Sequence, residues 1–389
     1  YIPPFDTNPA FPDKTSTNVT VANPFPVKTG DQTVPLLLTA PNANSGQAKP
    51  AAGWPVVIFG HGITRSRADA LAMADAAASV GFAVVAMDFP MHGISPEDAV
   101  LAPLYVGNGP FKDIANERTF DVDYINNSTG LPHGPGESDV ADPSGTHFLN
   151  LTSLLTTRDN MRQGSIDLSV LAASLPFMSI DGDALPDLDA SSVVYVGHSL
   201  GAILGTPFVA IEPTVTNAFL SAGMGGVARG FEASDTFGPL IRAGLAANGV
   251  LPGTADYEFF FTVLQTVLDS ADPVNWAAEG AMFNNVVMHE IVGDTVFPNF
   301  QLTAPLSGTE PLIAVMGLTS YNSTTSNPSG VDLAGRFLPP ASHGSLLDPS
   351  TSPAATAEMQ KQLASFLATR GTTVLVENAA TMAPPPTPS

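Results

Sequence analysis

The sequence predicts an α/β fold built on a doubly wound, mostly parallel sheet. Two β-branched apolar runs, at residues 55–60 and 82–87, flank an Ala-rich helical segment at residues 66–80. Ser66 suits the N-cap of that helix, and Gly81 follows its end. A strand, a helix and a strand in this order form a βαβ unit, whose two strands are parallel. The same alternation returns in apolar runs at 192–196, 216–222 and 285–292.

Weaker patterns complete the domain organisation. Residues 1–50 are rich in Pro, Thr and Asn and predict an N-terminal arm with an edge strand at 34–38, because Pro35 is tolerated at a sheet edge. Residues 51–377 predict one α/β domain, and residues 378–389 a disordered Pro-rich tail. Within the domain we expect helices at 158–175 and 354–370, strands at 312–316 and 336–338, and a long, loop-rich segment at 93–160.

Composition excludes several classes of protein. The 389 residues are 44% hydrophobic, which supplies a deep core and argues against intrinsic disorder. The net charge of −22 repels phosphate backbones, so we expect no nucleic-acid partner. No apolar run approaches the roughly 20 residues that cross a bilayer, so we expect no integral membrane protein. The chain has no cysteine, which removes disulfides, thiolate catalysis and thiolate metal sites.

Four aspartates at 181, 183, 187 and 189 are the strongest hint of a metal site. They lack the glycine and the ligand spacing of an EF-hand loop, so we predict no metal and no cofactor. A Thr/Asn/Pro-rich beginning that opens on Tyr1, together with the Pro-rich end, favours a processed and exported protein. The sequence contains no signal for an oligomeric state.

The strongest functional signal is the pentapeptide Gly197-His198-Ser199-Leu200-Gly201, which follows a β-branched strand and precedes a helical segment. This is the G-x-S-x-G nucleophile elbow in its expected setting. A sharp turn raises the serine clear of the sheet, and glycines on either side let strand and helix approach closely. The alternative is a structural turn. We predict that Ser199 is a catalytic nucleophile.

A serine needs a base to take its proton, and in this arrangement the acid and then the histidine follow the serine along the chain. His343 lies in a loop after a strand, whereas His289, the other histidine beyond Ser199, lies within a strand. We therefore predict His343 as the base. Asp294 follows the strand at 285–292 and is the predicted acid; Asp332 and Asp272 are rivals with weaker strand context.

The oxyanion hole is predicted to combine the N–H of Leu200 with one N–H from the loop after the first buried strand. Glycines in that loop allow an inward-pointing N–H, and either Gly62 or Ile63 is the second donor. We expect His61 and His198 to support the site by hydrogen bonds. His92 is expected to be a structural residue at the rim, with substrate contact as the alternative.

Residues 225–280 interrupt the alternation of strands and helices between the elbow and the acid loop. They predict an inserted helical lid over the active site, with ordinary core helices as the alternative. Under the lid hypothesis an apolar wall faces the acyl chain of an ester substrate. Its predicted members are Leu240, Ile241, Phe259, Phe260 and Phe261.

Taken together, these residues resemble the α/β-hydrolase superfamily, and in particular the exported bacterial lipases and esterases of the virulence-factor type. The resemblance rests on the elbow, on Gly60-His61-Gly62, on the string from Asp88 to Gly93 and on Ser342-His343-Gly344. It implies a secreted or cell-surface serine carboxylesterase or lipase that uses no cofactor. Some similar esterases also cleave polyesters, so polyesters are a further substrate class that the resemblance implies. The alternatives are an amidase, peptidase or acyltransferase with the same triad, or an inactive binding protein on the same scaffold.

Overall fold

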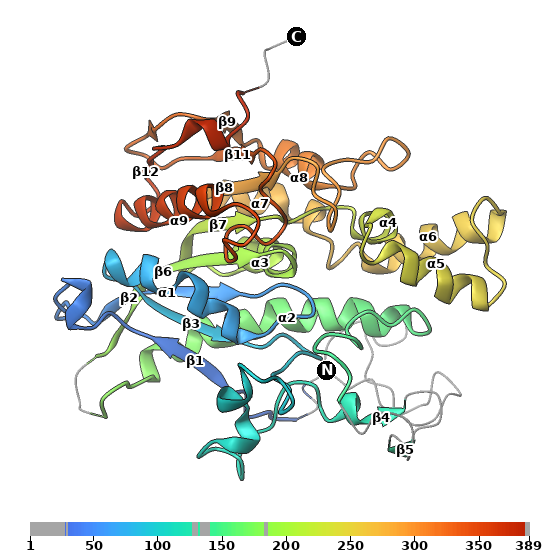
Figure 1. Cartoon of the computed structure of the whole chain (residues 1–389), viewed down its shortest axis with the longest axis horizontal. Helices are drawn as coiled ribbons and strands as arrows, with labels where there is room; N and C mark the ends of the chain where they lie inside the picture. Colours follow the sequence, from blue (N-terminus) through green and yellow to red (C-terminus); the bar gives the residue numbers. More distant parts are fainter. Residues whose placement is uncertain (1–27, 29, 127–130, 133–140, 183–185, 386–389) are drawn as a thin grey trace.

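A computed structural model describes residues 28, 30–126, 131–132, 141–182 and 186–385. Its main sheet has, in this described part, eight strands in the order β1-β3-β2-β6-β7-β8-β11-β9 (Figure 1). Only β1 pairs antiparallel, at the edge next to β3; every other pair in the sheet is parallel. The predicted α/β class is confirmed, and this sheet is that of the α/β-hydrolase fold. The strands are β1 (Leu36–Thr39), β2 (Trp54–Gly60), β3 (Ala83–Met87), β6 (Leu188–His198), β7 (Val215–Ser221), β8 (Asn285–Ile291), β9 (Thr319–Tyr321) and β11 (Leu333–Phe337).

Helices cover both faces of the sheet because its strands are apolar on both sides. Val56 and Ile58 of β2 belong to one buried cluster, and Val57 and Phe59 to another. The first cluster includes side chains of α2 (Leu154–Ser174), α3 (Leu200–Ile211), α7 (Ala277–Phe283) and α8 (Thr309–Met316). The second includes side chains of α1 (Leu71–Ser79) and α9 (Pro353–Ala368). The helix predicted from 66 begins as a 3-10 turn, η2 (Arg67–Ala70), and the Ser66 side chain caps it as expected.

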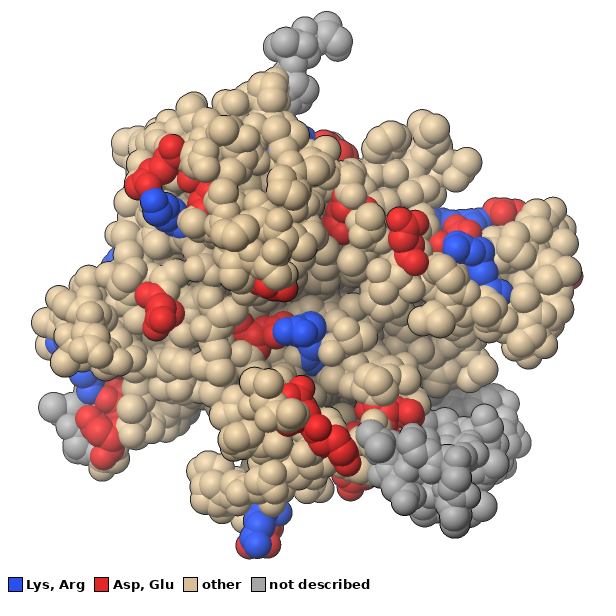
Figure 2. Space-filling view, viewed as in Figure 1, with Lys and Arg blue, Asp and Glu red and all other residues tan. Residues whose placement is uncertain are grey.

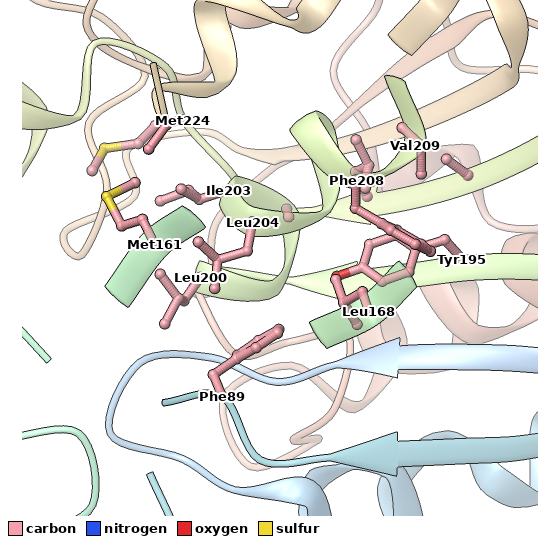
Figure 3. Close-up of a cluster of buried hydrophobic side chains, with 14 of the residues drawn as sticks. Phe89, Met161, Leu168, Tyr195, Leu200, Ile203, Leu204, Phe208, Val209 and Met224 are labelled. Carbon is pink, nitrogen blue, oxygen red and sulfur yellow. The ribbon is translucent and has the colours of Figure 1, made fainter. Parts of the chain in front are cut away.

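The central helix α3 packs its apolar side chains on β6 and α2 (Figure 3). Tyr195 of β6 is fully buried there, and its hydroxyl donates to the Gly201 carbonyl at 2.5 Å. A side chain at Gly205 would lie 2.0 Å from the Tyr195 ring, so a glycine is needed for this close approach. The helix that follows the elbow is therefore fixed against the middle of the sheet.

Helices α4 (Val227–Ala233), α5 (Gly238–Ala247), α6 (Ala255–Leu268) and α7, with the short η7 (Pro273–Asn275), are inserted between β7 and β8. Most of them lie at one end of the molecule, where α5 and α6 form a projecting pair (Figure 1). The segment predicted from the sequence as an insertion at 225–280 thus consists of helices.

Two sequence expectations differ from the structure. Residues 312–316, predicted as a strand, belong to helix α8, in which Leu312, Ile313 and Met316 are the buried face; so short an apolar run does not distinguish a strand from a buried helix. Of the segment predicted from 378 as a tail, the described part is packed on the domain: the turn η8 (Ala379–Thr381) is followed by Met382, which is buried and bridges to Phe337. Residues 1–27 of the predicted arm and residues 386–389 lie outside the described residues.

The loop-rich segment after β3 contains only short elements in its described part: η3 (Ala102–Leu104), η4 (Val106–Asn108), η5 (Val122–Tyr124), β4 (Ile125–Asn126) and β5 (Leu131–Pro132). A buried ionic cluster fastens it to the sheet. The Arg67 guanidinium contacts both Asp88, at the end of β3, and Glu117 of this segment. Elsewhere the minor elements are η1 (Ala43–Ser45), η6 (Leu175–Phe177), β10 (Thr325–Ser326) and β12 (Thr373–Val374).

The surface reflects the acidic composition. On the face shown in Figure 2, the few blue side chains lie beside red ones and form no basic patch. Among the described residues, no helix has the length and apolar character needed to span a bilayer.

Candidate active site

Ser199 occupies a strained turn between β6 and α3. Its backbone angles are φ 56° and ψ −116°, a region that costs a non-glycine residue about 1–3 kcal/mol. The turn is compressed against β2, because a Cβ at Gly201 would lie 2.0 Å from the Gly60 carbonyl oxygen. A Cβ at Gly197 would likewise lie 2.5 Å from the Gly201 carbonyl oxygen. Both glycines of the pentapeptide are therefore required sterically, and they hold Ser199 at the tip of the turn.

Ser199, His343 and Asp294 form one hydrogen-bonded chain. The Ser199 Oγ lies 2.7 Å from the His343 Nε2, and the His343 Nδ1 lies 2.7 Å from the Asp294 Oδ2. Three separate loops bring these side chains together from positions far apart in the sequence. The Asp294 side chain is 1% exposed, so its charge acts on the imidazole with little screening by solvent. This is the geometry in which a histidine accepts a serine proton and a carboxylate orients the ring.

The loop that carries Asp294 is fixed by its own hydrogen bonds. The Asp294 Oδ1 accepts the N–H groups of Val296 and Phe297 at 2.8 and 3.2 Å. Asn299 closes the base of the loop by accepting from the Gly293 N–H and donating to the Ile291 carbonyl. One carboxylate oxygen is thus used to hold the loop, and the other is left for His343.

The rival residues have other partners. Asp332 is exposed and accepts the Val286 N–H at 3.0 Å. Asp272 is buried and accepts the N–H groups of Gly226 and Val227, so it caps the start of α4; burial raises its pKa. His289 is buried in β8 beside Gln362, and burial lowers its pKa to about 3. None of the three is bonded to Ser199 or His343 in the described structure.

The predicted oxyanion donors lie beside the nucleophile. Leu200 is the first residue of α3, and its N–H has no acceptor among the described residues. A Cβ at Gly62 would lie 3.6 Å from the Ser199 Oγ, so the turn after β2 passes directly alongside the hydroxyl. The N–H groups of Gly62 and Ile63 also lack an acceptor in the described part of the chain. Either of them is available to a ligand oxygen.

Three neutral histidines surround the site. The His61 Nε2 accepts the Phe89 N–H at 3.0 Å, and its Nδ1 lies 2.8 Å from the Gly62 carbonyl. The His198 ring packs 5.3 Å from that of His343. Burial lowers the pKa of His61 and His92 to about 3 and that of His198 well below its usual value. The support expected of His61 is present; the His198 Nδ1, by contrast, is buried without a partner among the described residues.

The inserted helices reach the site through an aromatic contact that the sequence did not single out as functional. Phe297 of the acid loop packs edge-on against His343 at 5.1 Å. Phe231 of α4 and Phe237, just before α5, pack on Phe297 in turn. The Asp235 N–H also donates to the Thr295 carbonyl at 3.0 Å. The insertion therefore adjoins the acid loop directly.

The five residues predicted to form an apolar wall do not share one face. Ile241 and Phe261 are buried, and Phe261 packs on Tyr257 and under the Arg229 guanidinium, so both belong to the interior of the helical insertion. Leu240 and Phe259 are 71% and 68% exposed. Phe260 is partly buried. A continuous wall made of these five is incorrect, because consecutive residues of a helix point in different directions.

The aspartates considered as a metal site serve the fold in the part that is described. The Asp187 carboxylate contacts Lys49 and accepts the Ile180 N–H at 2.5 Å. Among the described residues there is no group of three or more His, Asp or Glu side chains placed to hold a metal ion.

No protein-family model and no curated protein matches this sequence. Solved structures are similar in fold. A thermophilic esterase (Est2) from the Planctomycetes species Thermogutta terrifontis is 14% identical, with 86% of this chain and 87% of that chain covered and a TM-score of 0.45. A lipase in its open form is 14% identical, with 86% and 93% covered and a TM-score of 0.43.

A puromycin-hydrolyzing peptidase from Mycobacterium tuberculosis is 11% identical, with 88% of this chain and 39% of that chain covered and a TM-score of 0.48. With TM-scores below 0.5, these similarities assign no activity to this chain.

Proposed function

We propose that this protein is a serine hydrolase that cleaves carboxylic esters, a carboxylesterase or lipase. The observation that carries the proposal is the continuous hydrogen-bonded chain from Ser199 through His343 to Asp294, at 2.7 Å in both steps. The proposal is supported by the strained turn at Ser199 and by the adjacent N–H groups, which have no acceptor among the described residues and suit an oxyanion site.

In the proposed reaction His343 takes the Ser199 proton as Oγ attacks the ester carbonyl. The negative charge that develops on the carbonyl oxygen is stabilised by the N–H of Leu200 and that of Gly62 or Ile63. His343 then gives its proton to the leaving alcohol, which leaves an acyl group on Ser199. A water molecule, deprotonated by His343, then attacks the acyl group. His343 returns that proton to the Ser199 Oγ as the carboxylic acid leaves, which restores the serine. Asp294 orients the imidazole and stabilises its charged form throughout.

Esters are preferred over amides as the proposed substrate class because of the apolar surroundings of the centre. Phe297 packs on His343, and Phe231 and Phe237 pack on Phe297, so an aromatic cluster borders the centre on the side of the insertion. Each buried methylene of a substrate contributes roughly 0.8 kcal/mol. The triad itself fixes the nucleophile and not the leaving group, so an amidase or peptidase is the second candidate.

We further propose that the insertion α4–α6 is a lid, since it adjoins the acid loop at Thr295 and Phe297. The exported location and the cleavage of polyesters, both implied by the resemblance, are likewise proposals. The first is tested by fractionating the source cells, and the second by soluble products released from a polyester film.

The central experiment labels the protein with a fluorophosphonate and measures turnover of p-nitrophenyl esters from two to sixteen carbons, with p-nitroanilides in parallel. We expect labelling at Ser199 and ester turnover that falls by about 10⁴-fold or more in Ser199→Ala. The matched control is Ser221→Ala, another buried serine at the end of the neighbouring strand. Faster cleavage of anilides than esters would favour the amidase, and an unlabelled Ser199 would exclude both enzymes.

A further inference from the structure

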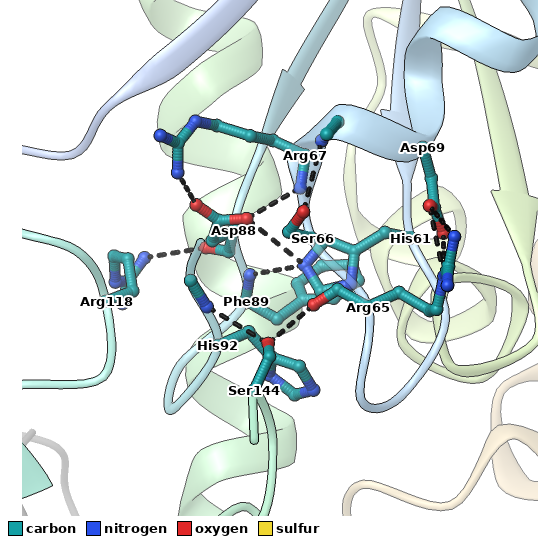
Figure 4. Close-up of polar contacts among 12 residues, drawn as sticks. His61, Arg65, Ser66, Arg67, Asp69, Asp88, Phe89, His92, Arg118 and Ser144 are labelled. Carbon is teal, nitrogen blue, oxygen red and sulfur yellow. Dashed lines mark hydrogen bonds and ion pairs between the residues drawn. The ribbon is translucent and has the colours of Figure 1, made fainter. Parts of the chain in front are cut away.

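The turn after β2, residues 62–65, is held from outside by two residues for which the proposed mechanism has no role. The Thr64 N–H donates to the His92 Nε2 at 3.3 Å. The Ser144 hydroxyl donates to the Arg65 carbonyl at 2.7 Å and accepts the Gly93 N–H at 3.1 Å. Figure 4 shows Ser144 joining the turn to the segment that carries His92. Three parts of the chain, from before α1, after β3 and before α2, therefore meet at this turn.

The tautomer of His92 follows from its two neighbours. Its Nδ1 lies 2.9 Å from the Pro90 carbonyl, which can only accept, so Nδ1 carries the proton. Nε2 then has a free lone pair for the Thr64 N–H. Burial lowers the pKa of His92 to about 3, so the ring remains neutral and keeps this acceptor at any ordinary pH.

The contact between Thr64 and His92 is covered by backbone. A Cβ at Gly145 would lie 2.4 Å from the His92 Nε2 and 2.9 Å from the Thr64 N, so only glycine fits over this hydrogen bond. The Gly145 N–H donates to the Met91 carbonyl at 3.0 Å, which fixes it there. Thr64 itself has a φ of 65°, which is costly for a β-branched residue. Such a conformation persists only where its surroundings enforce it.

We propose that His92 and Ser144 are positioning residues that hold this turn so that the N–H of Gly62 or Ile63 points at the carbonyl oxygen of the reacting ester. The inference rests on the proposed function and adds the parts of the chain that set the oxyanion geometry. The two residues act through the turn: His92 restrains Thr64, and Ser144 restrains Arg65. One oxyanion donor is worth about 10²–10³-fold in kcat, so a small displacement of the turn has a large effect.

The first test compares Ser144→Ala with Thr146→Ala. Ser144→Ala removes the two hydrogen bonds of the Ser144 hydroxyl, to Arg65 and Gly93. Among the described residues the Thr146 hydroxyl bonds only to the Pro143 carbonyl within the same loop, at 2.6 Å. We expect Ser144→Ala to lower kcat roughly tenfold to a hundredfold with KM changed less than about threefold, because the oxyanion contact is strongest in the transition state. A trifluoromethyl ketone, which forms a tetrahedral adduct, should lose affinity by a similar factor. Thr146→Ala should behave as the unmodified protein.

The second test exchanges the acceptor at His92. His92→Gln offers an oxygen to the Thr64 N–H, and His92→Leu fills similar space without an acceptor. We expect His92→Leu to lose kcat and ketone affinity together, and His92→Gln to restore part of both. Melting temperatures are measured for every variant; if His92→Leu does not fold, the comparison of Ser144→Ala with Thr146→Ala decides alone.

Unchanged kcat and ketone affinity in folded Ser144→Ala would overturn the positioning role, as would a loss confined to KM. Failure of the proposed function has a different signature: the unmodified protein itself would show no fluorophosphonate label at Ser199 and no ester turnover.

Discussion

The sequence predicts the nucleophile elbow more precisely than it predicts the inserted helices. At the elbow, Ser199 lies in the strained turn expected of it, because Gly197 and Gly201 are packed against backbone atoms closer than any Cβ allows. In the insertion the helices were expected, yet Phe259 is exposed and Phe261, two positions further on, is buried. The sequence therefore predicts the placement of individual residues at the elbow, but only the presence of helices in the insertion.

The difference has a steric origin. A glycine at a close backbone approach has no substitute, so its presence in the sequence reports a local geometry directly. A phenylalanine is compatible with many environments, and its direction depends on how the helix is rotated against its neighbours. That rotation is set by contacts from elsewhere in the chain, such as the Arg229 side chain over the Phe261 ring.

The largest expected effect is on kcat, in the catalytic residues that the sequence predicted individually. Asp294→Asn should lower kcat by about 10⁴-fold, because an amide cannot hold His343 in the required tautomer. Asp332→Asn is the matched control: in the described part of the chain this exposed carboxylate bonds only to the Val286 N–H, and its replacement should leave kcat within about twofold. Ester turnover of both purified variants gives the answer, and a greater loss in Asp332→Asn would move the acid to that residue.

The insertion provides the next largest effect, now on stability. Phe261→Ala should destabilise the protein by about 3–5 kcal/mol, since it empties a buried site beneath Arg229 and beside Tyr257. Phe259→Ala, on the same helix and 68% exposed, should change the free energy of unfolding by less than about 0.5 kcal/mol. Denaturant unfolding of the pair measures the contrast, and equal effects would mean that the rotation of α6 differs from the one described.

The parts of the site that could be predicted are those fixed by local chemistry and chain order. Ser199, Asp294 and His343 come from loops that follow β6, β8 and β11, and parallel strands bring such loops to one edge of the sheet. Gly62 was found in the same way, from the loop after β2. These residues could be predicted because each lies in a loop that follows a recognisable strand.

The residues that were missed lack such a marker. Ser144 lies in a long loop, and nothing near it in sequence reports that its hydroxyl reaches Arg65, 79 positions away. Phe297 lies three positions after the predicted acid, but its contact with Phe231 depends on the placement of α4 and its contact with His343 on the fold of the loop after β11. The position of Gly145 directly before a Thr-His pair gave no hint that it covers His92. Contacts of this kind require the tertiary arrangement.

A third region for comparison is the sheet itself, where β8 contains a buried carboxyl group, that of Glu290. Its side chain is 3% exposed and lies 3.5 Å from Arg336, whose guanidinium is held at 2.6 Å by Glu310. Burial, followed by the charge of Glu310, raises the pKa of Glu290 to about 8. The folded protein therefore keeps this proton at neutral pH, whereas an unfolded chain releases it near the ordinary value of 4.5.

The smallest expected effect follows from that difference. Between about pH 4.5 and 8 the folded state binds more protons at Glu290 than the unfolded state does, so this group makes stability fall as pH rises. The buried histidines His61, His92 and His289, with pKa values lowered to about 3, act in the opposite sense, and their contribution is lost as pH falls below about 6.5. The test therefore uses the window from pH 6.5 to 8, above the ordinary pKa of histidine and below the raised pKa of Glu290. There, Glu290→Gln should flatten the decline of Tm by a few degrees, while Glu279→Gln, an exposed carboxylate on α7, should leave the slope unchanged. Parallel Tm-against-pH curves for the unmodified protein and Glu290→Gln would mean that Glu290 is already ionised at neutral pH and that Arg336 compensates its charge in full.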